Sequence, residues 1–434
     1  MNDRSARGVI AWVGSTDVER RAIDAKKMSL RDIQALKSAK ETYETAYGAD
    51  TGEDDNLAEP EITAADEAAA AVAPMSEPRW SQWAAATGQP AAEPAAEPSA
   101  TPMVALKTVW TAAANVGNDA EVFCVRYSPD DALVAAGSGD GTVRVLHAGD
   151  GRLAYELASP TAEKLPVTCL RFRPASATSK TKNLLLVANA DGTVRHWHVT
   201  SRKCLHTITE ENNQVFAIDY RQDGARFATA GKDYTVRVYD EATKTKVAAL
   251  HGGFGKQSTG HSNRVFSLKF SAADPNLLIS AGWDNTIQVW DLRTEHAVRA
   301  LFGAHICGDA VDLHVHTLVS GSWRPESQLQ LWDVRTGELV DDDKQIPWRN
   351  PEAVGAAEPC QLYACQFSKD PGARLIAAGG TGANELRIFD REAHRAIGFM
   401  TMPKGVYGLD WSMDGKTVAV AGGDGSVRSI AVPL

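Results

Sequence analysis

The stretch NLLISAGWDNTIQVWDLRT, residues 276–294, combines two short apolar runs with a polar turn between them. Asp284 and Asn285 suit a tight hairpin, because both side chains favour turn conformations. The alternation of apolar and polar residues after the turn is typical of a β-strand. The second run ends on Trp290 and Asp291, an aromatic–acid pair at the end of the predicted strand.

The aromatic–acid pair recurs along the chain. Close versions are Tyr239-Asp240, Trp332-Asp333 and Phe389-Asp390, and looser versions are Leu146-His147, Trp197-His198 and Ile430-Ala431. The first members of these pairs are 41 to 57 residues apart. Repeats of about 40–45 residues, with some longer loops, are typical of β-propellers.

Two further rows of residues align with these pairs. A turn aspartate precedes five of the outer strands, at Asp140, Asp191, Asp233, Asp284 and Asp424. Upstream lies a nearly continuous apolar run that indicates an inner strand buried on both faces: VFCVRY (122–127), VTCLRF (167–172), VFAIDY (215–220), VFSLKF (265–270), LYACQF (362–367), VYGLDW (406–411) and, as a weaker member, AVDLHV (310–315). Seven rows predict seven blades. The fifth and sixth lack the turn aspartate and carry SWRPESQ and TGANE instead.

These motifs resemble the WD40-repeat β-propeller family over residues 106–434. The resemblance implies an all-β, seven-bladed WD40-type β-propeller in which the blade Trp is hydrogen-bonded to a Ser or Thr, a His and the turn Asp. In this sequence the complete set is Trp290, Ser280, His261 and Asp284, and its implied role is structural. The equivalent anchors of other repeats are Trp197, Tyr239, Trp332 and Phe389, together with Asp140, Asp191, Asp233 and Asp424.

The last repeat ends at SVRSIAVPL and has no room for a fourth strand. The segment LKTVWTA (106–112) is an unattached strand before the first repeat. We predict that it completes the last blade, so that the ring closes without an open edge. The domain prediction is therefore an extension over 1–104 and a propeller over 105–434.

The extension differs in composition from the propeller. Thr16 and Glu19 have capping-box spacing before a helix predicted at about 17–47. Nine acidic residues then lie between Asp50 and Glu77, without a Lys or Arg among them, and they account for most of the net charge of -10. The following Pro/Ala/Glu-rich segment has the composition of disordered chain.

Composition also argues against several classes of function. No basic cluster is present to neutralise nucleic-acid phosphates, and no apolar run reaches the about 20 residues of a membrane span. The six cysteines include no Cys-x-x-Cys pair, which favours reduced, buried thiols. The first residues do not resemble a secretory signal, so a soluble, cytoplasmic protein is expected.

No catalytic or cofactor-binding constellation stands out. GGFGKQSTG (252–260) lacks the spacing and the following helix of a phosphate loop. The pairs His196/His198 and His314/His316 each share a strand face, but a metal site needs further ligands. We therefore expect no enzyme activity, no metal, no cofactor and no small-molecule substrate.

Large and cationic residues are predicted to gather on the end of the ring that carries the Asp turns, and Trp and Arg are common interface anchors. These candidate partner-binding residues are Lys232, Trp283, Trp323, Arg324, Trp348 and Arg349. The alternative is that the aromatics pack locally on their own blades. In the extension, Trp80 and Trp83 form a candidate docking motif, with a strap along the propeller as the alternative.

The primary hypothesis is a non-catalytic scaffold for other proteins, with the extension as an arm that binds a larger assembly. The segment 280–333 also resembles poorly characterised WD-repeat proteins of ciliated or flagellated organisms, which implies a cytoskeletal or axonemal assembly. The second hypothesis is a recognition subunit, such as a ubiquitin-ligase substrate receptor or a chromatin adaptor. The third, an enzyme on a propeller platform, has no candidate residues.

Overall fold

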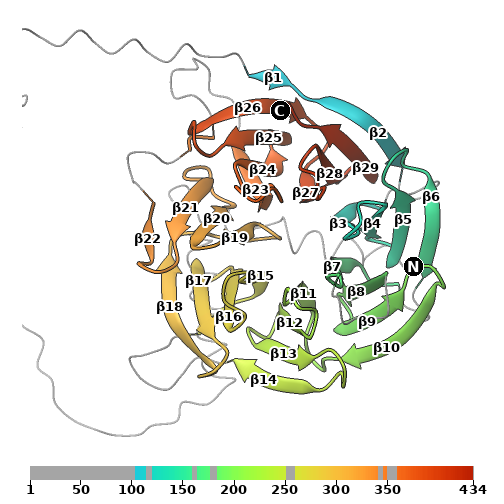
Figure 1. Cartoon of the computed structure of the whole chain (residues 1–434), viewed down its shortest axis with the longest axis vertical. Coiled ribbons are helices and arrows are strands. Elements are labelled where there is room, and N and C mark those ends of the chain that lie inside the picture. Colours follow the sequence, from blue (N-terminus) through green and yellow to red (C-terminus); the bar gives the residue numbers. More distant parts are fainter. Residues whose placement is uncertain are drawn as a thin grey trace, which may run out of the picture. The chain divides into compact units, whose positions relative to one another are not determined.

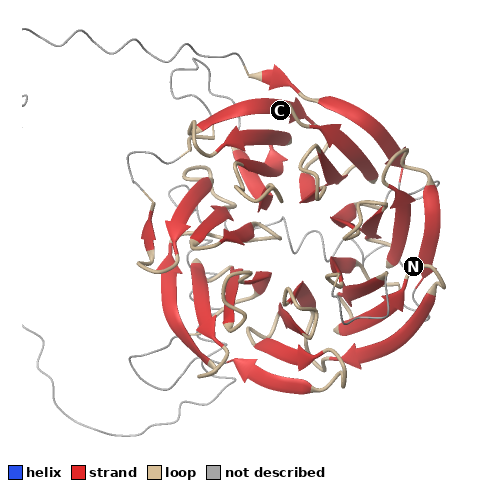
Figure 2. Ribbon diagram, in the orientation of Figure 1, coloured by secondary structure: helices blue, strands red, loops and turns tan. Residues whose placement is uncertain are grey.

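The computed structural model describes residues 103–113, 120–158, 164–175, 183–250, 260–340, 346–348 and 359–433. These residues form seven β-sheets arranged in a ring (Figure 1), and the sheets are antiparallel except for one added parallel strand; we call the space enclosed by the inner strands the channel. All regular elements in these ranges are strands (Figure 2). The prediction of an all-β, seven-bladed propeller is confirmed. The predicted helix at 17–47, Trp80, Trp83 and Arg349 lie outside the described residues.

Blades 1 to 4 are each a four-stranded sheet formed by one continuous segment. The strands are given from the channel outward. Blade 1 contains β3 (Val122–Tyr127), β4 (Leu133–Ser138), β5 (Thr142–His147) and β6 (Leu153–Ala158), and blade 2 contains β7 (Val167–Phe172), β8 (Leu184–Asn189), β9 (Thr193–His198) and β10 (Lys203–Thr209). Blade 3 contains β11 (Val215–Tyr220), β12 (Arg226–Gly231), β13 (Val236–Asp240) and β14 (Lys246–Leu250), and blade 4 contains β15 (Val265–Phe270), β16 (Leu277–Gly282), β17 (Thr286–Asp291) and β18 (His296–Phe302).

Blades 5 to 7 depart from this plan at their outer edges. Blade 5 has only a two-residue outer strand, blade 6 gains a fifth strand, and blade 7 takes its outer strand from the start of the described chain. Blade 5 contains β19 (Val311–His314), β20 (Thr317–Gly321), β21 (Leu329–Asp333) and β22 (Glu338–Leu339). Blade 6 contains β23 (Cys360–Phe367), β24 (Leu375–Gly382), β25 (Glu385–Asp390), β26 (Arg395–Thr401) and β1 (Val104–Ala105). Blade 7 contains β27 (Val406–Trp411), β28 (Thr417–Gly422), β29 (Ser426–Ala431) and β2 (Lys107–Ala113).

The segment that sequence analysis assigned to ring closure is β2, which pairs antiparallel with β29. Just before it, β1 pairs parallel with β26 of the neighbouring blade. Leu106 lies between the two pairings, is buried, and donates its backbone N–H to the Phe399 carbonyl at 2.9 Å. A Cβ on Gly398 would lie 2.5 Å from Leu106 Cδ2, so a glycine is needed where the chain crosses from blade 6 to blade 7.

Apolar residues are buried between blades as well as within them. Each hydrophobic cluster combines strands of adjacent blades, and one combines blades 3, 4, 5 and 6. Trp290 and Trp411 are among the largest fully buried side chains. In such an arrangement each repeat depends on its neighbours to cover its apolar surface.

The register of blade 5 differs from the prediction. Ser280 pairs with Leu268 in blade 4, and the equivalent Ser320 pairs with Val311 in blade 5. The inner row of blade 5 is therefore GDAVDL (308–313), two residues earlier than AVDLHV. A two-residue slip leaves every side chain on the same face of the strand, so the apolar pattern could not separate the two registers.

Candidate partner-binding surface

The four residues of the implied blade network are joined in blade 4. The Trp290 indole N–H donates to Ser280 Oγ at 2.7 Å, Ser280 Oγ lies 2.6 Å from His261 Nε2, and His261 Nδ1 lies 2.7 Å from Asp284 Oδ2. Burial alone would raise the pKa of Asp284, but hydrogen bonds from His261, Ser262 and Thr286 outweigh burial and lower it. The His261 and Asp284 side chains are almost fully buried. The chain of bonds holds the turn that carries Trp283.

The other turn aspartates are arranged alike. Asp140, Asp191, Asp233 and Asp424 each accept the backbone N–H two residues later. Each also pairs with the arginine four residues later: Arg144, Arg195, Arg237 and Arg428. These turns hold the hairpins at the face of the ring where the inner strands begin. We call it the Asp-turn face.

Blade 3 replaces the histidine of the network with a buried carboxylate that sequence analysis missed. Glu210 accepts hydrogen bonds from Tyr239 at 2.9 Å and from Asn213 at 2.6 Å. It also accepts from Thr229 and pairs with Arg237. Burial raises the pKa of Tyr239, and the Glu210 charge raises it further. The sequence signal that could have revealed this network is Glu210 itself, an acidic residue in the loop before the inner strand of blade 3, near the place where the repeat motif of blade 4 has His261.

The remaining anchors lie inside their blades. Trp332 donates its indole N–H to Ser320 Oγ at 2.9 Å, which repeats the first bond of the blade 4 network. Trp197 and Phe389 are buried.

A row of rings lies on the Asp-turn face over blades 4 and 5. Its members, the ring-face cluster, are Phe266, Trp283, His305 and Trp323. Ring centroids are separated by 5.2 Å from Phe266 to Trp283, 6.1 Å from Trp283 to His305 and 6.5 Å from His305 to Trp323. The Trp283, His305 and Trp323 side chains remain partly exposed. The Arg264 guanidinium lies 5.0 Å from the Trp283 centroid, a cation–π contact.

Aromatic rings also continue around the mouth of the channel. The second residue of five aligned inner rows is aromatic: Phe123, Phe216, Phe266, Tyr363 and Tyr407. Phe216 stacks on Phe266 at 4.7 Å, and Tyr407 contacts Tyr363 at 5.5 Å and Phe123 at 5.7 Å. Burial raises the pKa of Tyr407 to about 12. The aligned rows already contained this pattern, but sequence analysis did not use it.

The structure separates the candidate partner-binding residues into two groups. Trp283 and Trp323 belong to the ring-face cluster, Lys232 is exposed and Arg324 is partly exposed on the same face. Trp348 is only 5% exposed, which corrects its assignment as a surface residue. Its ring centroid lies 5.4 Å from that of Phe389 and 5.4 Å from the Arg387 guanidinium, so the side chain is covered by contacts with blade 6.

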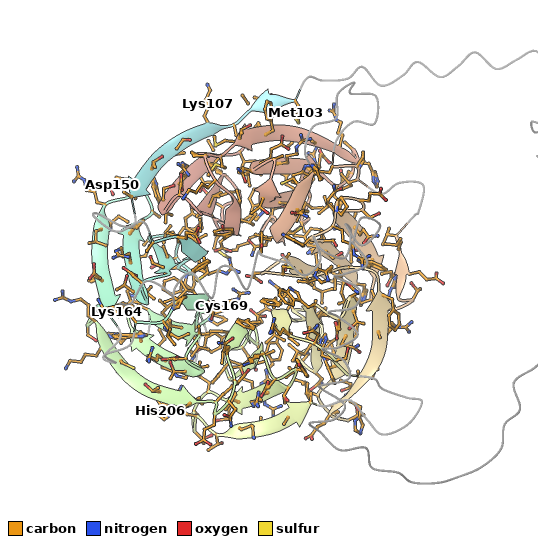
Figure 3. All side chains as sticks on the ribbon, turned by 180° about the vertical axis from the view of Figure 1, so that it is seen from behind. Met103, Lys107, Asp150, Lys164, Cys169 and His206 are labelled. Atoms are coloured by element: carbon orange, nitrogen blue, oxygen red, sulfur yellow. The ribbon has the colours of Figure 1, made fainter. Side chains whose placement is uncertain are left out.

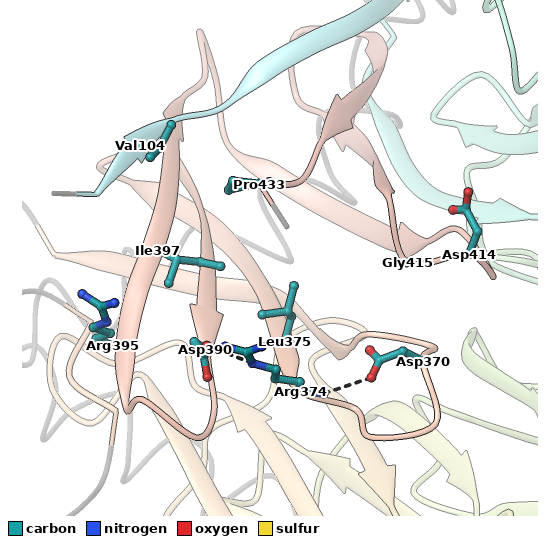
Figure 4. A pocket seen from close by; sticks show the side chains of 10 residues that line it. All are labelled: Val104, Asp370, Arg374, Leu375, Asp390, Arg395, Ile397, Asp414, Gly415 and Pro433. Carbon is teal, nitrogen blue, oxygen red and sulfur yellow. Dashed lines mark hydrogen bonds and ion pairs between the residues drawn. The ribbon is translucent and has the colours of Figure 1, made fainter. Parts of the chain in front are cut away.

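The channel and one outer groove are the other concave features. Cys169 lies close to the centre of the ring, whereas Asp150 and His206 lie at its rim (Figure 3). A cavity of about 400 Å³ at the far end of the channel is lined by charged residues of the inner strands. A groove of about 450 Å³ lies between blades 6 and 7 and is lined by Val104, Ile397 and Arg395 among others (Figure 4). In it, Arg374 pairs with Asp390 at 2.6 Å.

Within the described ranges, no group of three or more His, Cys, Asp or Glu side chains is arranged to hold a metal ion. The same part of the chain contains no helix of the length and apolarity that crossing a bilayer requires. The polar groups of the networks described above are hydrogen-bonded to one another.

Comparison of the sequence with known protein families finds one family of repeats in this chain. A sequence model for the WD domain, G-beta repeat, matches residues 110–146, 202–240, 254–291 and 398–429. The chain is 25% identical to the periodic tryptophan protein 2 homolog of Dictyostelium discoideum over 183 residues, which is 42% of this chain and 18% of that protein.

Two further relatives are covered over more of their length. The guanine nucleotide-binding protein subunit beta of Arabidopsis thaliana is 25% identical over 285 residues, 63% of this chain and 69% of that protein. The cell division cycle protein cdt2 of Schizosaccharomyces pombe is 24% identical over 303 residues, 52% of this chain and 60% of that protein. The names refer to different processes, so what the matches share with this chain is the propeller.

Proposed function

Since the chain belongs to the WD40-repeat family, whose propellers are interaction modules, we propose that it is a non-catalytic scaffold that binds another protein through the ring-face cluster. The observation that supports this function is the partly exposed row of Trp283, His305 and Trp323. Aromatic side chains bury large areas at low entropic cost and dominate the energetics of many interfaces.

The ring-face cluster is held in its binding conformation before a partner arrives. The Trp283 indole N–H donates to Cys307 Sγ at 3.0 Å, and its turn is held by the His261–Asp284 pair below it. A surface that is already ordered loses little conformational entropy on binding, so more of the contact energy contributes to affinity. Lys232 and Arg324 add positive charge to the same face, which favours a partner with acidic residues beside its apolar contacts.

The experiment uses affinity capture from the source cells with full-length protein and quantitative mass spectrometry. We expect Trp323→Ala and the double charge reversal Lys232→Glu/Arg324→Glu to remove the same partners. The matched control is Phe302→Ala, since Phe302 is 68% exposed but lies on outer strand β18. Circular dichroism checks that each variant is folded. Unchanged capture by both ring-face variants would exclude this surface.

We further propose that residues 1–104 are an arm that anchors the propeller in a larger assembly in the cytoplasm, with a cytoskeletal or axonemal assembly as the specific candidate. The support is the resemblance of segment 280–333 and the Trp80/Trp83 motif in an acidic, low-complexity extension. Capture with residues 103–434 alone tests the arm. Partners that depend on residues 1–102 and belong to the cytoskeleton would support it, and partners that all persist on the bare propeller would contradict it.

The alternative is a recognition subunit, such as a ubiquitin-ligase substrate receptor or a chromatin adaptor. The feature that favours it is the pair of partly exposed rings Phe123 and Tyr407 at the mouth of the channel, which an inserted side chain could contact. The same capture experiment separates the two functions. Ligase or chromatin components among the partners that need the ring face would favour recognition over assembly.

A further inference from the structure

The far end of the channel, opposite the Asp-turn face, is lined by a circle of charged and polar side chains. The fifth residue of each aligned inner row, which is GDAVDL (308–313) in blade 5, lines the cavity there: Arg126, Arg171, Asp219, Lys269, Asp312, Gln366 and Asp410. Buried charges need partners, because an unpaired ion in the interior costs several kcal/mol. Each of these groups is therefore expected to bond to a neighbouring blade.

Most junctions between blades follow one rule. A carboxylate accepts the backbone N–H of the sixth inner residue on the next blade: Asp219 from Phe270 at 2.8 Å, Asp312 from Phe367 at 3.0 Å and Asp410 from Tyr127 at 2.7 Å. Gln366 accepts from Trp411 at 3.1 Å in the same way. Cations complete the circle, with Arg171 bound to Asp219 at 3.0 Å and Lys269 bound to Asp312 at 2.7 Å.

The junction of blades 1 and 2 breaks the rule, because both fifth residues are arginines. Burial lowers the pKa of Arg126, and the nearby Arg171 lowers it further. The carboxylate that neutralises them comes from across the channel, from Asp309 in blade 5. Its oxygens lie 2.9 and 3.0 Å from Arg171 and bond to Arg126 as well. Asp309 occupies the second inner position of blade 5, where five other blades carry an aromatic ring.

Asp309 also belongs to the segment 304–310, which reaches up to the ring-face cluster. His305 stacks on Trp283 and lies tilted against Trp323, and its backbone carbonyl accepts the Trp323 N–H at 2.8 Å. The Ile306 N–H donates to the Gly282 carbonyl at 3.2 Å, and Cys307 accepts the Trp283 indole N–H. A side chain on the binding surface, His305, thus lies only four positions from one fixed in the channel, Asp309.

The segment has little freedom between these two points. A Cβ on Gly308 would lie 2.4 Å from the Tyr363 carbonyl oxygen, so the backbone packs directly on blade 6. The Ala310 N–H donates to the Gly308 carbonyl at 2.8 Å. A displacement at Asp309 is therefore transmitted to His305 instead of being absorbed by a flexible loop.

We propose that Asp309 is a positioning residue: a latch across the channel that holds segment 304–310, and through it the ring-face cluster, in the conformation that binds a partner. The proposal extends the proposed function, since it concerns how that surface is held. Its test measures amide exchange and not binding, so the two proposals can fail separately.

The test compares Asp309→Asn with Asp312→Asn by hydrogen–deuterium exchange of the full chain. Both variants remove a carboxylate from blade 5, at positions three apart, but Asp312 bonds to Lys269 of blade 4, Phe367 of blade 6 and Leu313 of its own strand, and not across the channel. We expect Asp309→Asn to speed exchange of the Ile306 and Trp323 amides by about tenfold or more through local opening. Asp312→Asn is expected to leave these two amides protected while loosening β23.

Two results would overturn the proposal: protection of Ile306 and Trp323 unchanged in Asp309→Asn, or equal loss in both variants, which would indicate a general structural role. If Asp309→Asn does not fold, Arg126→Gln/Asp309→Asn is used instead. This double variant removes one of the two arginines that repel each other together with the carboxylate. The charge repulsion between blades 1 and 2 is then reduced, while the contact of Asp309 across the channel is still absent. The same amides decide the outcome.

Discussion

The Asp410 carboxylate in blade 7 accepts the backbone N–H of Tyr127 in blade 1 at 2.7 Å. These residues are 283 positions apart, and the bond closes the circle of inner strands from inside the channel. On the outside, β2 closes the same blade by pairing with β29. The ring is therefore closed twice, once by a side chain at its centre and once by a strand at its rim.

Removal of β2 is expected to open the ring. A fragment of residues 103–434 keeps β1 and β2, whereas a fragment of residues 115–434 loses both and with them Trp110, which is buried and donates to the Ala148 carbonyl at 2.7 Å. An open edge on β29 then invites association with other chains. We expect the longer fragment to melt cooperatively as a monomer and the shorter one to be unstable or aggregated in calorimetry and light scattering. Equal melting temperatures would contradict this role of β2.

Substitution of Trp290 tests the blade 4 network. Trp290→Ala leaves a cavity and deprives Ser280 of its donor, so we expect a loss of about 3–5 kcal/mol in the free energy of unfolding. Trp290→Phe keeps most of the volume and removes the indole N–H, which is expected to cost about 1–2 kcal/mol. Chemical denaturation of both variants measures the two terms. Equal costs would mean that the hydrogen bond, and not packing, is the whole effect.

Glu210 is expected to stabilise blade 3 as the histidine network stabilises blade 4. Glu210→Ala leaves Tyr239, Thr229 and Arg237 without their buried acceptor, and loss of one partner from such a buried group costs about 3–5 kcal/mol. The neighbouring Glu211 is exposed and is the matched control, with an expected change within about 0.5 kcal/mol for Glu211→Ala. Urea denaturation of both variants checks the difference. A similar stability for both would remove Glu210 from the network.

Asp284 is expected to make stability depend on pH under acid conditions. Its pKa in the folded protein is lowered, so its contribution is fully present above the unfolded value, about 3.9 for Asp, and is lost as pH falls through the folded value. The wild type should therefore lose stability below about pH 4 more steeply than Asp284→Asn, which lacks this carboxylate. The control is Asp150→Asn, a change at an exposed carboxylate on the rim (Figure 3). Parallel stability–pH curves for wild type and Asp284→Asn would contradict the assignment.

Local sequence patterns were sufficient to predict most of the fold. The Asp turns, the alternation of the outer strands and the apolar inner rows are all short-range signals, and they repeat often enough to be recognised together. The blade 4 network was also readable from the sequence, because His261, Ser280, Asp284 and Trp290 occupy regular positions in one repeat. The registers of six blades followed from the same alignment.

The partner-binding surface was readable only in part. Trp283 and Trp323 lie where the repeat pattern places them, next to the turn between the second and third strands of their blades. Trp348 lies in a long loop without a repeat pattern, and only the structure reveals that Phe389 and Arg387 of the next blade bury it. Glu210 was missed because its partners are gathered from three separate segments of blade 3.

The sequence by itself determined the number of blades, their order and the inner rows of six of them, because these depend on periodicity within about 40 residues. The tertiary structure decided the register of blade 5, the burial of Trp348 and the position of Asp309 between Arg126 and Arg171. The last of these depends on contacts between residues far apart in the sequence, such as Asp309 and Arg171, which are 138 positions apart. A strand pattern of period two identifies the face of each residue, but it does not identify the distant side chain that the residue will meet.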